Sequence, residues 1–138
     1  MKKIPYNIFK RIVDNMPILC VDILCRHKGK FLLLKRKNKP VKGRFWVPGG
    51  RVLKGEKVRQ AVIRKMKDET GINIEIIKAV GYFEADYQGN EFGSKTGYHG
   101  VSIVFLVSPL SLKIKLDGQS SDWKFSEKLP KLFKINYF

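Results

Sequence analysis

The sequence predicts an α/β fold in which a mixed β-sheet carries helices on its faces. Apolar runs rich in β-branched and aromatic residues alternate with polar turns, and two segments have the spacing of amphipathic helices. Pro48-Gly49-Gly50 links one of the apolar runs to the second helix. With 138 residues, 43% of them apolar, and no internal repeat or linker, residues 1–138 are predicted to form a single domain.

The first predicted elements are a short helix and two strands. Residues 6–15 have the apolar spacing of an amphipathic helix, and Pro17 ends it. Residues 18–27 form a nearly continuous apolar strand, and a turn leads from it to the strand 31–36. Asp22 interrupts the first strand on an otherwise apolar face, where a carboxylate indicates a site residue or a paired core charge.

The same strand contains both cysteines of the chain, Cys20 and Cys25. Their odd separation points them to opposite faces of a sheet. This arrangement matches neither a zinc pair nor a disulfide framework. We therefore expect two buried thiols.

Residues 56–70 predict the second helix. The segment lacks Gly and Pro, has Val58, Val62 and Met66 one turn apart, and is followed by Gly71. Lys65 and Glu69 project from this apolar side, so a buried Glu69 must be paired or bind a metal. Taken alone, a pair at i and i+4 is also the pattern of a solvated surface ion pair.

The remaining chain predicts further strands and a last helix. Ser126 is a plausible N-cap for that helix. In order, the segments are a basic loop (37–44), a strand leading to the glycines (45–47), a β-rich run (73–87), a polar glycine-rich loop at the border of the site (88–97), a strand (99–107), a connection (113–116), a polar loop (117–122), a short strand (123–125) and a helix (127–132).

Residues 45–72, FWVPGGRVLKGEKVRQAVIRKMKDETGI, contain most of the Nudix box. Gly50 is followed after five residues by Glu56 and after seven more by Arg64, and Glu69 stands near the end of the motif. Lys65 replaces the first helical Glu of the family, and an Asp replaces the middle one. The stretch resembles the Nudix hydrolases, which implies the α/β/α sandwich of the Nudix fold with a mixed β-sheet.

Residues 31–52, FLLLKRKNKPVKGRFWVPGGRV, are similar to the corresponding stretch of GDP-mannose mannosyl hydrolases. This resemblance implies hydrolysis of a nucleotide sugar, GDP-mannose or GDP-glucose, to GDP and free sugar. Water would attack the anomeric carbon, with one divalent cation, Mg²⁺ or Mn²⁺, as cofactor. Such enzymes are usually homodimers, so we expect a homodimer here.

The resemblance also implies roles for individual residues. The substrate contacts would be Asp22, Arg36, Arg51 and Tyr87. The arginines that neutralise the diphosphate would be Arg36, Arg51 and Arg64, with Arg36 offering a bidentate fork. The metal ligands would be the Gly49 carbonyl, Glu69 and Gln119, to which we add Asp68 as a neighbouring carboxylate, an oxygen set that suits Mg²⁺.

One position departs from the mannosyl hydrolases in a way that affects catalysis. The family places a His directly after the metal-binding Gln, whereas this chain has Ser120, and a hydroxyl is not a useful base near neutral pH. We therefore predict Asp122 or His99 as the group that orients the attacking water. Two alternatives stay open: attack at phosphorus of a nucleotide or sugar nucleotide, and a basic Nudix domain that binds nucleotide or RNA without turnover.

The charge of the chain is strongly positive, with 28 basic and 12 acidic residues and a net charge of +16. Such a balance favours polyanions: nucleotides, nucleic acid or an acidic surface. The basic residues are scattered rather than gathered in a tail, so the charge alone does not identify the partner. The resemblance implies a nucleotide-sugar substrate, and we expect no nucleic-acid partner. No apolar run reaches the length of a membrane span and no signal segment begins the chain, so we expect a cytoplasmic protein without membrane contact.

Overall fold

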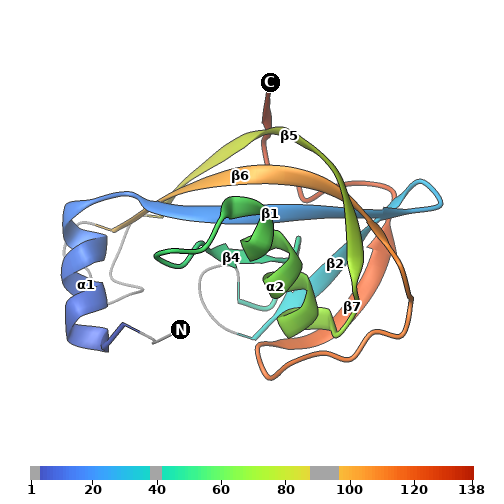
Figure 1. The fold of residues 1–138 in the computed structure, drawn as a ribbon, viewed down its shortest axis with the longest axis horizontal. Coiled ribbons are helices and arrows are strands. Elements are labelled where there is room, and N and C mark those ends of the chain that lie inside the picture. Colours follow the sequence, from blue (N-terminus) through green and yellow to red (C-terminus); the bar gives the residue numbers. More distant parts are fainter. Residues whose placement is uncertain (1–3, 38–41, 88–96) are drawn as a thin grey trace.

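The computed structural model describes residues 4–37, 42–87 and 97–138. Its elements are α1 (Tyr6–Asn15), β1 (Ile18–His27), β2 (Lys30–Arg36), β3 (Phe45–Trp46), β4 (Gly49–Arg51), α2 (Val58–Thr70), β5 (Ile74–Tyr87), β6 (Tyr98–Pro109), β7 (Ser120–Ser126) and β8 (Asn136–Tyr137). They form a mixed sheet with two helices, which confirms the predicted fold class (Figure 1). Neither helix in these ranges is long and apolar enough to cross a membrane.

Strand β1 is the central strand of the sheet. It pairs with β6 in parallel along one edge, while every other strand pair is antiparallel. Its other edge is divided between two partners, because Asp22 lies opposite Gly49 of β4 and Arg26 lies opposite Phe31 of β2. This division brings the carboxylate of β1 directly beside the glycine pair.

Alternate side chains of β1 face opposite layers. Val21, Ile23 and Cys25 are buried in one core cluster with Val62 and Met66 of α2. Figure 1 shows α2 lying across β1 and β4 on this side. The apolar stripe predicted for the second helix therefore faces the sheet.

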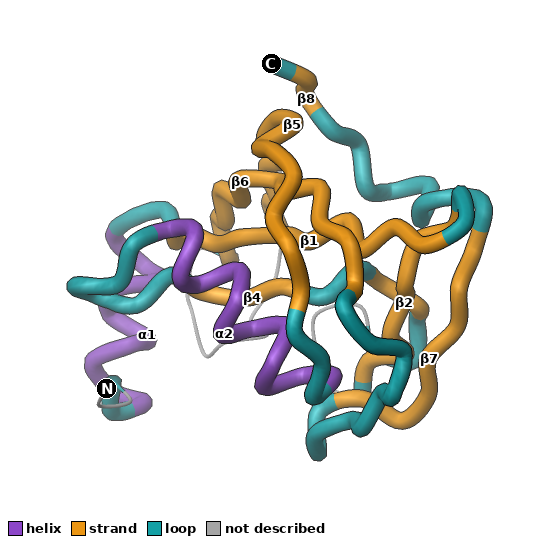
Figure 2. Tube along the Cα trace, turned by 45° about the vertical axis from the view of Figure 1, so that its right-hand side comes forward, coloured by secondary structure: helices purple, strands orange, loops and turns teal. Residues whose placement is uncertain are grey.

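The other side chains of β1 face the side away from α2. Ile18 and Cys20 pack with Val13 of α1, while Leu24 belongs to a cluster that includes Trp46 and Phe133. Cys20 and Cys25 are both buried and free, as predicted. The C-terminal segment that carries Phe133 runs without a helix from β7 to β8 (Figure 2).

Helix α2 begins at Val58, two residues later than predicted, and ends where predicted. Glu56 is drawn into the preceding loop, because its carboxylate accepts a hydrogen bond from the backbone N–H of Leu53 at 3.1 Å. Lys57 precedes the helix, and its N–H donates to the Gln60 side chain at 3.0 Å. Gly71 ends the helix with φ 74°, a left-handed conformation that glycine adopts without strain.

The predicted helix over 127–132 is wrong. Ser126 does not cap a helix but closes a turn, since its hydroxyl bonds to both the N–H and the carbonyl of Lys128. Pro130 lacks an N–H and disfavours helical geometry at the residue before it, so the segment cannot continue as a helix.

Two predicted boundaries also differ. The polar loop over 117–122 ends at Gln119, because β7 pairs with β2 from Ser120 onwards. Gly49 and Gly50 were predicted to follow a strand but lie inside β4. The predicted loop 88–97 falls, except for Gly97, outside the described residues, as do residues 38–41 of the predicted basic loop.

Candidate active site around the glycine pair

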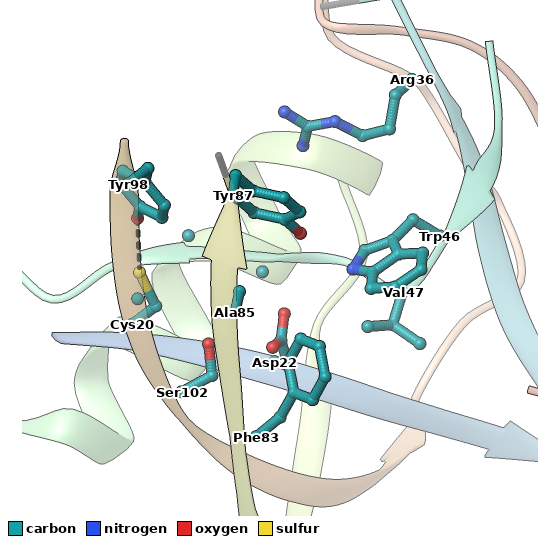
Figure 3. A pocket seen from close by; sticks show the side chains of 13 residues that line it. Cys20, Asp22, Arg36, Trp46, Val47, Phe83, Ala85, Tyr87, Tyr98 and Ser102 are labelled. Carbon is teal, nitrogen blue, oxygen red and sulfur yellow. Dashed lines mark hydrogen bonds between the residues drawn. The ribbon is translucent and has the colours of Figure 1, made fainter. Parts of the chain in front are cut away.

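A cavity of about 120 Å³ opens on the side of the sheet away from α2. Its wall is polar at Asp22, Arg36 and Ser102 and is otherwise formed mainly by aromatic rings and the glycine backbone. Figure 3 shows the Asp22 carboxylate pointing into this cavity, with the Arg36 guanidinium at its upper side. The aromatic residues of the wall are Trp46, Phe83, Tyr87 and Tyr98.

Asp22 is held against the glycine strand. Its side chain is buried, and a Cβ atom on Gly49 would lie 2.6 Å from its Oδ1, so only glycine fits there. Burial raises the pKa of Asp22 to about 7, and the nearby Glu69 adds to that rise. A hydrogen bond with Ser102 and the positive charge of Arg36 oppose it.

Arg36 presents an unused hydrogen-bond donor. Its Nε is buried, and the described part of the chain offers that atom no partner. A buried donor without an acceptor costs free energy, so such an atom calls for an explanation. An anionic ligand in the cavity would supply the missing acceptor.

The helix side of the glycine strand carries a second buried carboxylate, Glu69, which is 2% exposed. Its Oε2 accepts a hydrogen bond from the N–H of Gly49 at 3.2 Å, and its Oε1 lies 3.5 Å from Nζ of Lys65. Burial raises the pKa of Glu69, and Lys65 is the strongest influence against that rise. The partly buried Lys65 and the buried Glu69 thus form a largely shielded pair, not a solvated surface pair.

Only the backbone of strand β4 lies between the cavity with Asp22 on one side and the Lys65–Glu69 pair on the other. A Cβ on Gly49 would meet Asp22 on the cavity side, whereas a Cβ on Gly50 would lie 2.5 Å from Cε of Lys65 on the helix side. Neighbouring residues of a strand point to opposite faces, which accounts for this alternation. Because neither residue has a side chain, the cavity and the Lys65–Glu69 pair are only a backbone apart.

In the described part of the chain, few side chains near β4 could bind a hard cation through oxygen, and the buried carboxylates among them are Asp22 and Glu69. Within the described ranges, no group of three or more His, Cys, Asp and Glu side chains is placed to hold a metal. Glu69 and Asp22 are nevertheless two buried carboxylates, and the charge of Glu69 helps to raise the pKa of Asp22. A divalent cation bound by oxygen ligands would relieve that repulsion.

Arg64 lies outside the cavity and is fully engaged by neighbouring groups. Its Nε is 2.6 Å from Oε2 of Glu56, its Nη2 donates to the Arg51 carbonyl at 2.9 Å, and its Nη1 lies 3.5 Å from Oδ2 of Asp68. The hydrogen bond from Arg64 lowers the pKa of Glu56. Arg64 therefore ties α2 to the end of β4, and the exposed Asp68 lies beside it.

Arg51 lies at the α1 end of the site. Its guanidinium carbon is 4.3 Å from the centre of the Phe9 ring, a cation–π contact that joins β4 to α1. Nearby, the Tyr98 hydroxyl and Cys20 Sγ share a hydrogen bond at 3.5 Å, and the Tyr98 ring stacks on Tyr87 with centroids 6.0 Å apart.

Gln119, Asp122 and His99 were predicted site residues, and all three lie away from the cavity. Gln119 is exposed, and its carbonyl accepts from the N–H of Lys37 at 3.0 Å. Asp122 is exposed and accepts from the N–H of Trp123 at 2.8 Å. His99 is exposed and lines a separate hollow near the end of α1. Of the predicted residues, the cavity brings together Asp22, Arg36, Gly49 and Tyr87, with Glu69 behind the glycine strand.

The sequence reasoning missed part of the wall. Ser102 was detectable, since it interrupts the apolar strand around it much as Asp22 interrupts β1. Trp46, Phe83 and Tyr98 carried no comparable signal, because they meet only through the pairing of strands distant in sequence.

A family model and comparisons with known proteins assign the chain to one family. The NUDIX domain model matches residues 16–131. The chain is 33% identical over 125 residues to the low-salt glycan biosynthesis protein Agl8 of Haloferax volcanii, covering 91% of this chain and 80% of that protein. It is 35% identical over 121 residues to the ADP-ribose pyrophosphatase of Methanocaldococcus jannaschii, covering 84% of this chain and 66% of that protein.

Among solved structures, the MutT NUDIX hydrolase from Burkholderia pseudomallei superposes with a TM-score of 0.66 at 25% identity. The match covers 85% of this chain and 89% of that one.

Proposed function

The chain belongs to the Nudix family of hydrolases, and from this premise we propose that it hydrolyses a nucleoside diphosphate sugar in the cavity beside β4. The observation that carries the proposal is the buried Nε of Arg36, for which the described residues supply no hydrogen-bond partner. It lies at a cavity that also contains Asp22 and the glycine pair. A planar guanidinium suits the paired oxygens of a diphosphate, and the close backbone approach at two glycines leaves room for one.

The names of two relatives support the same substrate class. ADP-ribose is itself a nucleoside diphosphate joined to a sugar, and glycan biosynthesis uses activated sugars. The strongly positive chain, with a net charge of +16, also favours a substrate that carries several negative charges. We propose GDP-mannose or GDP-glucose as the first candidate, on the resemblance of residues 31–52.

The chemistry required of the chain is mainly electrostatic. Breaking the bond between the anomeric carbon and phosphate oxygen builds negative charge on the departing GDP. We propose that Arg36 and Arg51 neutralise this charge directly and that Arg64 acts by fixing α2 against β4. The aromatic wall holds the sugar or base and excludes bulk water, while Asp22 and Tyr87 contact the substrate.

We propose one Mg²⁺ or Mn²⁺ as cofactor, held by Glu69 and the Gly49 carbonyl. When bound, the ion adds positive charge at the leaving diphosphate. Gln119 and Asp68 stay predicted ligands, but both are exposed and lie outside the cavity, so Glu69 gives the proposal its main support. The homodimer implied by the resemblance also stays a prediction, which light scattering of the purified protein would test.

A specific observation favours a second candidate function. Neither His99 nor Asp122, the two predicted bases, lines the cavity, so no predicted group is positioned to direct water at the anomeric carbon. Together with the likeness to an ADP-ribose pyrophosphatase, this favours attack at phosphorus, which would release a nucleoside monophosphate and a sugar phosphate.

The test is a panel of nucleotide sugars with Mg²⁺ and identification of the products. We expect release of GDP and free sugar from GDP-mannose or GDP-glucose. Release of GMP and sugar phosphate would establish the second candidate. Salt-sensitive binding of RNA with no turnover of any nucleotide would reject both.

A further inference from the structure

Lys65 holds an unusual position for a lysine on a helix. Its side chain is 14% exposed, whereas Lys67 on the same helix is exposed. The stem of Lys65 lies against Gly50, where any side chain would collide with it, and its Nζ points to Oε1 of Glu69 at 3.5 Å. We propose that Lys65 is a built-in cation of the active site, which competes with divalent ions for Glu69 and binds substrate phosphate once an ion has displaced it.

The charges around β4 support this role. Two carboxylates, Asp22 and Glu69, are buried on the two sides of the glycine backbone. Two cations act on Glu69, with Lys65 exerting the larger influence and Arg36 the smaller one. Glu69 is already paired with the ammonium of Lys65, so an ion that binds Glu69 must compete with that ammonium.

The geometry also defines what happens to the displaced ammonium. The end of the Lys65 side chain lies beside Gly50, so its Nζ is already close to the backbone of β4 and needs only a short movement when it leaves Glu69. That backbone lines the cavity in which we propose the diphosphate binds. A lysine ammonium is a mobile point charge with three donors, which suits exchange between a carboxylate and a phosphate.

Binding experiments test this inference separately from the proposed function. Only the part in which Lys65 binds substrate phosphate rests on the proposed function. The EDTA-treated full chain is titrated with Mn²⁺ alone, and free Mn²⁺ is followed by electron paramagnetic resonance. We expect one Mn²⁺ per wild-type chain. Lys65→Met should bind Mn²⁺ about tenfold more tightly, the factor that corresponds to one pKa unit of charge interaction. Lys65→Glu should bind a second Mn²⁺, because it adds a carboxylate one turn from Glu69.

Phosphate binding by Lys65 is measured by calorimetry with GDP in saturating Mg²⁺, the condition in which an ion has displaced Lys65 from Glu69. Lys65→Met should weaken GDP binding, while Lys65→Arg keeps the charge and should retain most of it. Lys67→Met is the matched control, because it removes the same charge from an exposed position of α2. It should change neither affinity beyond about twofold, as expected for screened surface charge.

Three results would overturn the inference. The first is equal Mn²⁺ affinity in Lys65→Met and Lys67→Met, and the second is unchanged GDP affinity in Lys65→Met. The third is a second Mn²⁺ bound by the wild-type chain. Thermal unfolding identifies a variant that fails to fold. If Lys65→Met fails to fold, the affinities of Lys65→Arg and Lys67→Met are compared instead. A wild-type chain with Lys65-dependent Mn²⁺ affinity but no turnover of nucleotide sugars would reject the proposed function and support this inference.

Discussion

A methyl group on Gly49 would lie 2.6 Å from Oδ1 of Asp22, so the glycine and the buried carboxylate fit together only because the glycine has no side chain. The next residue, Gly50, is constrained differently, since a methyl group there would meet only the flexible end of Lys65. The two neighbouring glycines are therefore not equivalent.

This difference gives a matched pair of substitutions. Gly49→Ala should lower the free energy of unfolding by about 1–3 kcal/mol, because the backbone carbonyl of Val21 also stands in the way and cannot rotate aside. Gly50→Ala should cost less, since the end of Lys65 can move. Urea unfolding followed by tryptophan fluorescence measures both. Equal losses would contradict the described packing.

Glu69→Gln should abolish Mg²⁺-dependent turnover while leaving the fold intact. The loss should be at least about 100-fold in kcat, the scale seen when a group that supports transition-state charge is removed. Steady-state kinetics at limiting Mg²⁺ and circular dichroism provide the two measurements. Glu75→Gln, an exposed change on β5, is the control. Wild-type activity in Glu69→Gln would show that the metal assignment is wrong.

Arg36→Lys should lower the activity of the enzyme without lowering the stability of its fold. The lysine keeps the charge but cannot form a fork with two phosphate oxygens, so kcat/KM for the nucleotide sugar should fall about 10- to 100-fold, a loss of about 1.4–2.8 kcal/mol. Stability should hold or rise, because the substitution removes a buried donor that has no partner among residues 4–37, 42–87 and 97–138. Arg59→Lys, at an exposed position of α2, should keep full activity. A drop in stability with unchanged kcat/KM would mean that Arg36 is structural.

The raised pKa of Asp22 predicts a pH dependence of stability. Below about pH 4, both folded and unfolded chains hold the proton. Between about pH 4 and about pH 7, the unfolded chain loses it while the folded chain retains it, so stability falls as the pH rises and then levels off. The difference in unfolding free energy between wild type and Asp22→Asn, measured in EDTA, should show this decline. Parallel pH profiles of the two proteins would contradict it.

The sequence predicted those parts of the fold and site that depend on local pattern. Helix α2 has an uninterrupted apolar spacing and a glycine stop, so its face and the pairing of Lys65 with Glu69 could be predicted. Strand β1 is a continuous apolar run broken by one carboxylate, which made Asp22 conspicuous.

Other features depend on contacts between distant segments. The glycine strand β4 exists because Gly49 and Gly50 pair with β1, and no local signal indicates that pairing. Trp46 and Tyr98 reach one cavity only through the arrangement of the sheet. At the C-terminus, the capping signal of Ser126 was local and misleading, since Pro130 follows within the same turn of chain.

Hydrolysis in ¹⁸O-labelled water tests the central claim most directly. The wild-type protein is incubated with GDP-mannose and Mg²⁺, and the products are analysed by mass spectrometry. The account predicts label in the free sugar, unlabelled GDP, loss of both products in Glu69→Gln, and release about 10- to 100-fold slower in Arg36→Lys. No labelled product from any nucleoside diphosphate sugar would contradict it, and label in GMP or sugar phosphate would place the attack at phosphorus.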